Sequence, residues 1–222
     1  MRVRARWPLR LIGIAVFGTV AAVPWSIMPS PRPPVPQHAA VDPDIERVAR
    51  YLEWRAPASI DPLLRRQVST AVVEEARLAG FDPLFILAVM EVESDFLPEA
   101  VSQANARGLL QLRAVTLREI ARHEELPEKA ALEPEAVVNL RLGIRYLALM
   151  RKRFRTTERA LAAWNAGPGA VTKALTETGV VPDRWLAFAR HVDREHRKLR
   201  RRFASETKTT VAQVGASGAA IE

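Results

Sequence analysis

The sequence predicts an all-α globular domain, and two kinds of signal carry that prediction. Asp42-Pro43, Asp61-Pro62 and Asp82-Pro83 each place an acidic N-cap residue before a proline at the first position of a helix. Apolar residues then recur at the spacing of one helical face, and the alternation typical of strands is scarce. We therefore expect seven or eight helices, packed around a core rather than as a regular bundle.

Each of the first three helices has an apolar face that follows directly from its start. These faces comprise Ile45, Val48, Ala49 and Leu52, then Leu64, Val68, Ala71 and Val72, then Phe85, Ile86 and Val89. The second helix should end near Gly80, since glycine readily closes a helix. Further helices are expected over residues 115–123, 134–154, 157–164, 169–178 and 182–202, with Glu133-Pro134 and Thr156-Thr157 as plausible starts.

The first 28 residues are unlike the rest of the chain. Arginines without any acid precede an apolar run from Leu11 to Met28 that contains no charged residue. As a helix this run would span about 27 Å, close to the hydrocarbon thickness of a bilayer. The basic flank would keep its start in the cytoplasm. Residues 1–28 are thus predicted to be a signal peptide or a membrane anchor; because Pro24 interrupts the run and no clear A-x-A site follows, we favour an uncleaved anchor.

Composition also marks the other segments. Residues 29–40 are rich in proline and are predicted to be an extended linker. Residues 204–222 are small and polar without periodicity, which is typical of a disordered tail. The folded domain should therefore occupy residues 41–203.

The net positive charge of the chain comes from its two ends. The 222 residues carry a formal net charge of +8 and a sequence pI near 10.7, which could indicate a nucleic-acid or membrane-surface protein. Residues 41–189, however, contain 20 basic and 21 acidic residues. A basic cluster lies at 194–202, but no aromatic residues or nucleic-acid motif accompany it, so we read it as a solvated helix end. The lack of cysteine excludes a disulfide framework, a cysteine-ligated metal site, a catalytic thiol and a lipobox anchor.

Two glutamates at the end of the third predicted helix are candidate catalytic residues. Glu91 and Glu93 are two residues apart, about 200° around a helix, so they face opposite sides and cannot act as a pair. If Glu91 is solvated, Glu93 points inward. Burial would raise the pKa of the Glu93 carboxyl, as a general acid at neutral pH requires. The alternative is a glutamate that caps or braces the following loop.

Two further stretches could face a ligand. In Gly108-Leu109-Leu110-Gln111, the glycine permits a close backbone approach, and Gln111 offers both a donor and an acceptor. At Trp164-Asn165, a helix ends before a tight turn at residues 167–169, and an aromatic ring beside an amide suits a sugar. Equally, Gln111 could be tied to backbone and Trp164 could fill the core.

Taken together, these stretches resemble the lysozyme-like domain of the soluble type (SLT) of lytic transglycosylases, which cleave bacterial peptidoglycan. That family shows E-S-x-F-x-P-x-A-x-S, then G-L-M-Q, then N…G…Y-L, then A-Y-N-A-G-x-G-x-V. The matching residues here are Glu93, Ser94, Phe96, Pro98, Ala100 and Ser102; Gly108, Leu109 and Gln111; Asn139, Gly143, Tyr146 and Leu147, preceded by Pro134; and Ala163, Asn165, Ala166, Gly167, Gly169 and Val171. The resemblance covers about residues 83–175.

The resemblance implies a role for each matched site residue. Glu93 would be the single catalytic acid, and Ser94 would brace its helix end. Ser102 and Gln111 would hold the glycan. Trp164, Asn165 and Tyr146 would complete the substrate-binding cleft. No metal or cofactor is implied.

Four positions depart from the family pattern. Leu110 replaces the usual Met, Asn105 a Gly, and Ala114 a Pro. Asn tolerates positive φ better than most residues, so the turn at Asn105 can survive. Trp164 stands where the family has a Tyr whose hydroxyl points towards the catalytic carboxylate, and Trp offers only an N–H donor.

The function implied by the resemblance is cleavage of the β-1,4 bond between N-acetylmuramic acid and N-acetylglucosamine. Most glycosidases use two carboxylates, and Asp95 and Glu99 look like solvated loop acids. One carboxylate suffices if the substrate's acetamido group stabilises C1 and its 6-hydroxyl closes a 1,6-anhydro ring. Two alternatives remain: a lysozyme-type hydrolase, or a catalytically weak glycan-binding scaffold, which Trp164 keeps open.

The implied location and partners follow from the same resemblance and from the N-terminal segment. We expect a protein on the periplasmic side of the inner membrane, anchored or secreted. Its expected partners are peptidoglycan strands and the inner membrane, with envelope-assembly proteins as further candidates and no nucleic acid.

Overall fold

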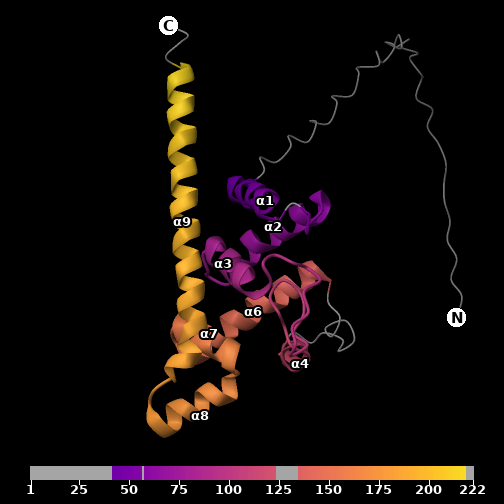
Figure 1. Cartoon of the computed structure of the whole chain (residues 1–222), viewed down its shortest axis with the longest axis vertical. Coiled ribbons are helices and arrows are strands. Elements are labelled where there is room, and N and C mark those ends of the chain that lie inside the picture. Colours follow the sequence, from indigo (N-terminus) through magenta and orange to yellow (C-terminus); the bar gives the residue numbers. More distant parts are fainter. Residues whose placement is uncertain (1–41, 57, 124–134, 219–222) are drawn as a thin grey trace, which may run out of the picture. The chain divides into compact units, whose positions relative to one another are not determined.

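The structure, a computed structural model, describes residues 42–56, 58–123 and 135–218 (Figure 1). These residues form eight helices and no β-strand, so the predicted all-α class is confirmed. The helices are α1 (Pro43–Arg55), α2 (Pro62–Leu78), α3 (Pro83–Ser94), α4 (Ala114–His123), α6 (Ala136–Phe154), α7 (Thr157–Ala166), α8 (Pro168–Thr178) and α9 (Asp183–Gly218). The predicted anchor or signal at 1–28, the linker at 29–40 and the helix start at Glu133-Pro134 lie outside the described residues.

The predicted N-caps are present at the first three helices. The Oδ1 atoms of Asp42, Asp61 and Asp82 accept hydrogen bonds from the backbone N–H two residues later, at 2.9, 2.8 and 2.9 Å. Thr156 caps α7 by accepting from the N–H of Arg159 at 3.2 Å. Each such cap contributes about 0.5–2 kcal/mol to stability, so these four residues fix where their helices begin.

The helix α3 is the most deeply buried element. Six consecutive residues from Phe85 to Met90 are buried, so the helix is apolar on all sides for more than a turn. A helix of this kind must be enclosed by other elements. Helices α2 and α9 pack directly against it, α7 packs against α9 and α6, and α1 and α6 pack against α2 (Figure 1).

The last helix extends well beyond its predicted end. Residues 204–222 were expected to form a disordered tail, but α9 runs as one helix of 36 residues to Gly218. Phe203 is buried against Tyr51, with ring centroids 5.7 Å apart, and Arg202 pairs with Glu206 one turn later. This packing carries the helix past 203, and no proline follows to stop it. Of the side chains beyond 206 nothing is described.

No helix in the described part of the chain is both long enough and apolar enough to cross a membrane.

The loop after α3 is built on left-handed backbone. Asp95 and Phe96 have φ of 51° and 61°, and Asn105 and Gln111 have φ of 56° and 45°. The prediction that Asn105 keeps the turn usually made by glycine is confirmed by its positive φ. A backbone hydrogen bond from the N–H of Ser102 to the carbonyl of Ala106, and isolated bridges from Arg107 to both Val101 and Leu112, then fold the loop back on itself.

Candidate active site

Glu93 lies in the last turn of α3, on the side facing α7. Its Oε1 accepts a hydrogen bond of 2.6 Å from Nε1 of Trp164. Burial raises the pKa of the Glu93 carboxyl to about 7, while the Trp164 N–H bond acts in the opposite direction. Desolvation of the charged form outweighs one hydrogen bond to it, so the pKa of this carboxyl lies much closer to neutral pH than that of an ordinary glutamate.

Glu91 points to the other side of α3, as its spacing predicts. Its Oε1 accepts from Nε of Arg55 at 3.2 Å, and its Oε2 accepts from the hydroxyl of Tyr51 at 3.4 Å. Arg55 also pairs with Asp95, the residue that ends α3. Glu91 and Asp95 are therefore both held by a cation of α1, and neither is bonded to Glu93.

The indole of Trp164 packs against the ring of Tyr146 on α6. The two ring centroids are 5.9 Å apart with planes tilted by 51°. Tyr146 is buried, and its hydroxyl points to Oε2 of Glu119 on α4 at 3.4 Å. Burial, with the Glu119 charge beside it, raises the pKa of Tyr146 to about 12. The phenol thus stays neutral and fixes the indole between α6 and α3.

The loop that carries Gln111 is braced by Asn139 on α6. Asn139 is buried; its Oδ1 accepts from the N–H of Leu110 at 3.1 Å, and its Nδ2 donates to the carbonyl of Arg107 at 3.0 Å. A Cβ on Gly108, which has φ of 78°, would lie 2.7 Å from Asn139. The glycine is required both for its backbone conformation and for this close approach.

Two more motif residues join the same loop to the core. A Cβ on Gly143 would lie 2.5 Å from Cδ1 of Leu110, so only glycine lets α6 approach the loop this closely. Ser94, also buried, places its hydroxyl 3.0 Å from the carbonyl of Leu109 and 3.2 Å from that of Met90. The end of α3 and the loop are thereby tied together directly beside Glu93.

Gln111 and Ser102, the residues predicted to hold the glycan, lie on this loop, and some of their polar atoms already form hydrogen bonds within the protein. The amide nitrogen of Gln111 donates to the carbonyls of Ala100 and Gly108, both at 3.0 Å. Its Oε1 has no partner among the described residues. Ser102 is exposed, and its Oγ accepts from the N–H of Ala106 at 3.0 Å, which leaves its hydroxyl hydrogen free to donate.

Asn165 is exposed at the end of α7, and its side chain makes no hydrogen bond to the described residues. Of the predicted site residues, the structure joins Glu93, Trp164 and Tyr146 in one contiguous row. Ser102 and Gln111 belong to the loop beside them, and no hydrogen bond links these two or Asn165 to Glu93.

Sequence reasoning missed the Arg55 cluster with Tyr51, Glu91 and Asp95. Its partners are 36 to 40 residues apart in sequence. Tyr51 and Arg55 share a face of α1 at the i, i+4 spacing, but this spacing does not identify a partner 36 residues away. The cluster is recognisable only in the folded chain.

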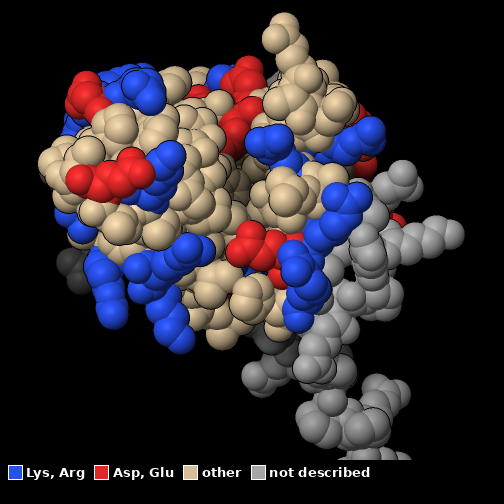
Figure 2. All heavy atoms as spheres, turned by 90° about the horizontal axis from the view of Figure 1, so that it is seen from below, with Lys and Arg blue, Asp and Glu red and all other residues tan. Residues whose placement is uncertain are grey.

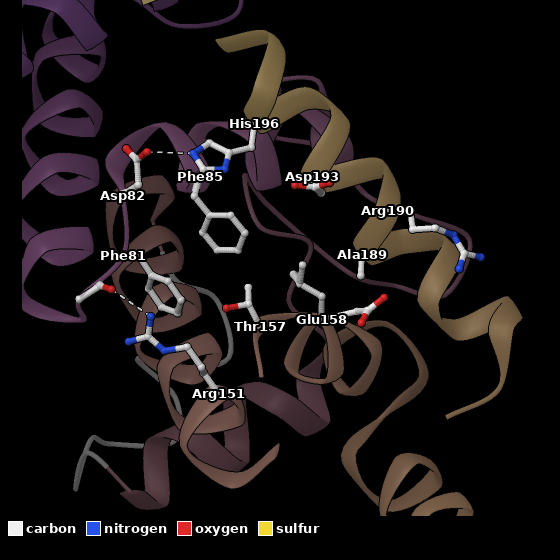
Figure 3. A pocket seen from close by; sticks show the side chains of 12 residues that line it. Phe81, Asp82, Phe85, Arg151, Thr157, Glu158, Ala189, Arg190, Asp193 and His196 are labelled. Carbon is white, nitrogen blue, oxygen red and sulfur yellow. Dashed lines mark hydrogen bonds and ion pairs between the residues drawn. The ribbon is translucent and has the colours of Figure 1, made fainter. Parts of the chain in front are cut away.

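A cavity of about 460 Å³ lies at the N-terminal ends of α3 and α7, whose other ends carry Glu93 and Trp164 (Figure 3). It forms where α3 and α7 begin, against α9, and the figure shows Phe81 and Phe85 as its aromatic lining beside a His196–Asp82 contact of 2.9 Å. Glu93 and Trp164 lie at the other ends of α3 and α7 and do not line it. In the described part of the chain, no three His, Asp or Glu side chains are grouped to hold a metal.

The charge on the surface is mixed. Figure 2 shows Lys and Arg interspersed with Asp and Glu, around a hollow between two masses of the molecule. On α9, Arg197 and Lys198 pair with Asp193 and Glu195. This alternation agrees with the solvated helix face expected for the basic cluster.

Comparison with known protein families identifies the same region of the chain. The family model described as the transglycosylase SLT domain matches residues 71–185. This range contains Glu93, the braced loop, Tyr146 and Trp164, and it extends from α2 to the start of α9.

Two curated relatives illustrate the degree of similarity. "Membrane-bound lytic murein transglycosylase C" of Actinobacillus pleuropneumoniae is 36% identical over 141 residues, which cover 58% of this chain and 36% of the relative. The protein of the same name from Haemophilus ducreyi is 34% identical over 158 residues, or 66% of this chain and 39% of the relative. The chain thus spans less than two fifths of the length of these relatives.

Among solved structures, the 70 kDa soluble lytic transglycosylase Slt70 of Escherichia coli is similar in fold. Its TM-score is 0.54 at 19% sequence identity, over 72% of this chain and 30% of that chain. At this identity the likeness concerns the fold alone, and it confirms the predicted lysozyme-like architecture.

Proposed function

Because this chain belongs to the SLT transglycosylase domain family, we propose that it is a peptidoglycan lytic transglycosylase in which Glu93 is the single acid and base. One observation carries the proposal: a part-buried carboxyl with a pKa of about 7 lies at the end of α3, and its one hydrogen-bond partner among the described residues is an indole N–H. General acids work best when their pKa is close to the ambient pH. The curated relatives that resemble this chain are named lytic murein transglycosylases.

The reaction that we propose needs one protein carboxyl. Protonated Glu93 gives its proton to the glycosidic oxygen, and the bond from that oxygen to C1 of N-acetylmuramic acid breaks. The oxygen of the sugar's own 2-acetamido group bonds to C1 as the leaving group departs. Glu93, now a carboxylate, then removes the proton of the 6-hydroxyl, whose oxygen displaces the acetamido oxygen at C1 and closes the 1,6-anhydro ring.

The arrangement of the other carboxylates supports a single-acid route. Retaining glycosidases place two carboxyl groups about 5–5.5 Å apart. The two acids closest in sequence to Glu93, Glu91 and Asp95, are both paired with Arg55 on the side of α1. Both are thus held on the α1 side of α3, away from the Trp164 side that Glu93 faces, so the proposed route assigns the nucleophile's role to the substrate's acetamido group.

The remaining site residues would hold the glycan strand. Oε1 of Gln111 accepts from a sugar N–H or O–H, since the amide nitrogen is already bonded. Ser102 donates its free hydroxyl hydrogen, and exposed Asn165 offers both a donor and an acceptor. Tyr146 is buried and therefore acts on the substrate through the indole that it supports.

The products test this proposal most directly. Purified peptidoglycan sacculi are digested with the protein, and the released fragments are analysed by mass spectrometry. Fragments ending in 1,6-anhydromuramic acid, 18 Da lighter than reducing-end fragments by loss of one water, are the expected result. Reducing-end fragments alone would instead show a lysozyme-type hydrolase, and binding without release would show a glycan-binding scaffold.

We propose a location in the bacterial envelope, with the domain on the periplasmic side of the inner membrane. The relatives' names contain "membrane-bound", and residues 11–28 form an uncharged apolar run after a basic start. Fractionation of cells that express the full chain, with and without residues 1–28, tests this. Membrane-associated protein that becomes soluble when residues 1–28 are removed is the expected result; envelope-assembly partners would then be sought by crosslinking in the same fraction.

A further inference from the structure

The end of α3 carries an unfavourable pattern of charge. Glu91, Glu93 and Asp95 are acids within five residues, and the last turn of the helix has no basic residue. Acids at the C-terminal end of a helix are opposed by the negative end of its dipole. Glu91 and Asp95 are also at i, i+4, where like charges repel each other. This turn therefore depends on a cation that another element supplies.

Arg55, the last residue of α1, supplies that cation. Its Nε donates to Oε1 of Glu91 at 3.2 Å, and its Nη2 donates to Oδ1 of Asp95. A guanidinium is a rigid, planar fork, so one side chain holds both carboxylates at a fixed separation. The guanidinium also lies 5.8 Å from the ring centroid of Phe96. Arg55 thus contacts the chain both before and after Glu93.

We propose that Arg55 is a positioning residue, which sets the place of the Glu93 carboxyl by binding the acids before and after it. This inference rests on the proposed function and extends it to α1, a helix that lies before residues 71–185 of the family match. Arg55 acts through the backbone of α3, because Glu93 itself is bonded on the other side of the helix, to Trp164.

The backbone that follows Glu93 needs such a contact. Asp95 and Phe96 have φ of 51° and 61°, in the left-handed region that residues with a side chain rarely adopt. Such backbone persists only where the surrounding contacts enforce it. Phe96 is fully buried and packs against Tyr51, while Asp95 is bound by Arg55. Without Arg55, Asp95 would lose this restraint, and the end of α3 could unwind towards Glu93.

The helix that carries Arg55 is itself held in place. Tyr51, one turn earlier on α1, donates its hydroxyl to Oε2 of Glu91 at 3.4 Å. Burial, with the Glu91 charge beside it, raises the pKa of Tyr51, so the hydroxyl stays neutral and continues to donate. The ring of Tyr51 packs against Phe203 of α9, with centroids 5.7 Å apart. Helix α1 therefore holds Glu91 at both carboxylate oxygens and is fixed against α9.

The first test compares the steady-state kinetics of Arg55→Met and Arg77→Met on soluble peptidoglycan fragments. Arg77 is the matched control, because it also pairs with two acids, Asp42 and Asp44, which belong to α1 and its N-cap. Circular dichroism first shows that each variant is folded at the assay temperature. The kcat of Arg55→Met should then fall by roughly 10- to 10²-fold, as for a misplacement of about 1 Å.

The KM of Arg55→Met should stay unchanged, because Arg55 has no proposed contact with the glycan. Arg77→Met should keep the wild-type kcat. A purely stabilising Arg55 would lower the melting temperature of the variant and leave the kcat of the folded protein as in wild type. That result, or an equal loss of kcat in both variants, would overturn the inference.

The second test removes the acids together with the arginine. Arg55→Met combined with Glu91→Gln and Asp95→Asn leaves no unpaired acid on this side of α3, and asparagine tolerates left-handed backbone. The triple variant should recover most of the kcat that Arg55→Met loses. Failure to recover would show that Arg55 does not act through these acids. Glu91→Gln alone keeps an oxygen that accepts from Arg55, so it should lose little activity.

The third test follows the Glu93 contact itself and does not depend on activity. The indole N–H of Trp164, bonded to Oε1 of Glu93, gives a peak in the ¹H–¹⁵N NMR spectrum of the full chain in detergent micelles, and Trp164→Phe identifies it. In Arg55→Met this peak should move upfield, because the hydrogen bond weakens. In Arg77→Met it should stay in place. An unmoved peak in folded Arg55→Met would overturn the inference.

Arg55→Lys replaces Arg55→Met if the latter does not fold. Lysine keeps the charge but lacks the fork that holds two carboxylates. The same loss of kcat and the same upfield movement of the Trp164 peak are then expected, each smaller than for methionine. Wild-type values of both in Arg55→Lys would overturn the inference.

These tests distinguish failure of the inference from failure of the proposed function. A wild-type protein that releases no fragments, but whose Trp164 peak moves in Arg55→Met, refutes the proposed reaction and retains Arg55 as the residue that places Glu93. An active wild type whose kcat and peak are both unchanged in Arg55→Met refutes the inference alone. A moved peak with an unchanged kcat also refutes it, because the reaction would not depend on this placement.

Discussion

Glu91 and Glu93 are two residues apart on α3 and have entirely different partners. Glu91 is bonded to Arg55 and Tyr51 of α1, while Glu93 is bonded to Trp164 of α7. The same side-chain type is thus placed in an ion pair on one side of the helix, and is part-buried beside an indole N–H on the other. This contrast provides an internal control for the proposed catalyst.

Glu93→Gln should abolish fragment release, and Glu91→Gln should not. The amide keeps the shape of Glu93 but has no proton to give, so we expect a loss of at least about 10²-fold. Zymography on peptidoglycan-containing gels, with mass spectrometry of released fragments, provides the measurement. Equal clearing by Glu93→Gln and wild type would remove Glu93 from the mechanism.

The raised pKa of Glu93 predicts a pH dependence of stability. The carboxyl titrates near 4.5 in the unfolded chain and at about 7 in the folded one, so between these values the folded state holds a proton that the unfolded state has lost. Stability must then fall as pH rises from 4.5 to 7 and stay lower above it. The full effect is at most about 3 kcal/mol.

Glu93→Gln removes this penalty. At pH 8 the variant should be more stable than wild type, and the difference should vanish below pH 4.5, where wild type is protonated in both states. Urea unfolding at several pH values measures the difference. For activity, the general acid must be protonated, so kcat/KM should fall above about pH 7; a rate that is flat from pH 6 to 9 would contradict the assignment.

Gly143→Ala should destabilise the domain. The new Cβ would lie 2.5 Å from Cδ1 of Leu110, and relief of such overpacking typically costs about 1–3 kcal/mol. Gly169→Ala is the control, since a Cβ there meets nothing within 4 Å, and it should leave the melting temperature unchanged or slightly raised. Combining Gly143→Ala with Leu110→Ala should cost less than the sum of the two, because the second change removes the clash.

Asn139→Ala and Asn165→Ala should affect different properties. Asn139→Ala leaves the Leu110 N–H without a partner among the described residues, at about 1–3 kcal/mol. It also removes one of the two hydrogen bonds to the Arg107 carbonyl, which keeps the bond from the Leu112 N–H. Its melting temperature should drop. The exposed side chain of Asn165 makes no hydrogen bond to the described residues, so Asn165→Ala should change stability by less than about 0.5 kcal/mol and raise KM. A destabilised Asn165→Ala or a fully stable Asn139→Ala would reverse these roles.

Much of the helical architecture is predictable because its signals are local. Asp42, Asp61 and Asp82 cap helices within three residues of themselves, and the uninterrupted apolar run from Phe85 to Met90 identifies a buried helix. The opposite placement of Glu91 and Glu93 also follows from helical geometry alone. Where the local signals are weak, the prediction is wrong: the polar residues after 203 lack periodicity, yet α9 continues to Gly218.

The sequence by itself therefore determined the helices, the inward side of α3 and the family motifs. Only the tertiary structure decided which groups meet: Trp164 with Glu93, 71 residues apart, Arg55 with Glu91, and Asn139 with the loop before Gln111. Periodicity and capping report on residues within about one turn of each other, whereas the pKa of Glu93 depends on burial by helices that are distant in sequence. The residue at position 164 could be read from the sequence as a departure from the family pattern, but its bond to Oε1 of Glu93 required the packed helices.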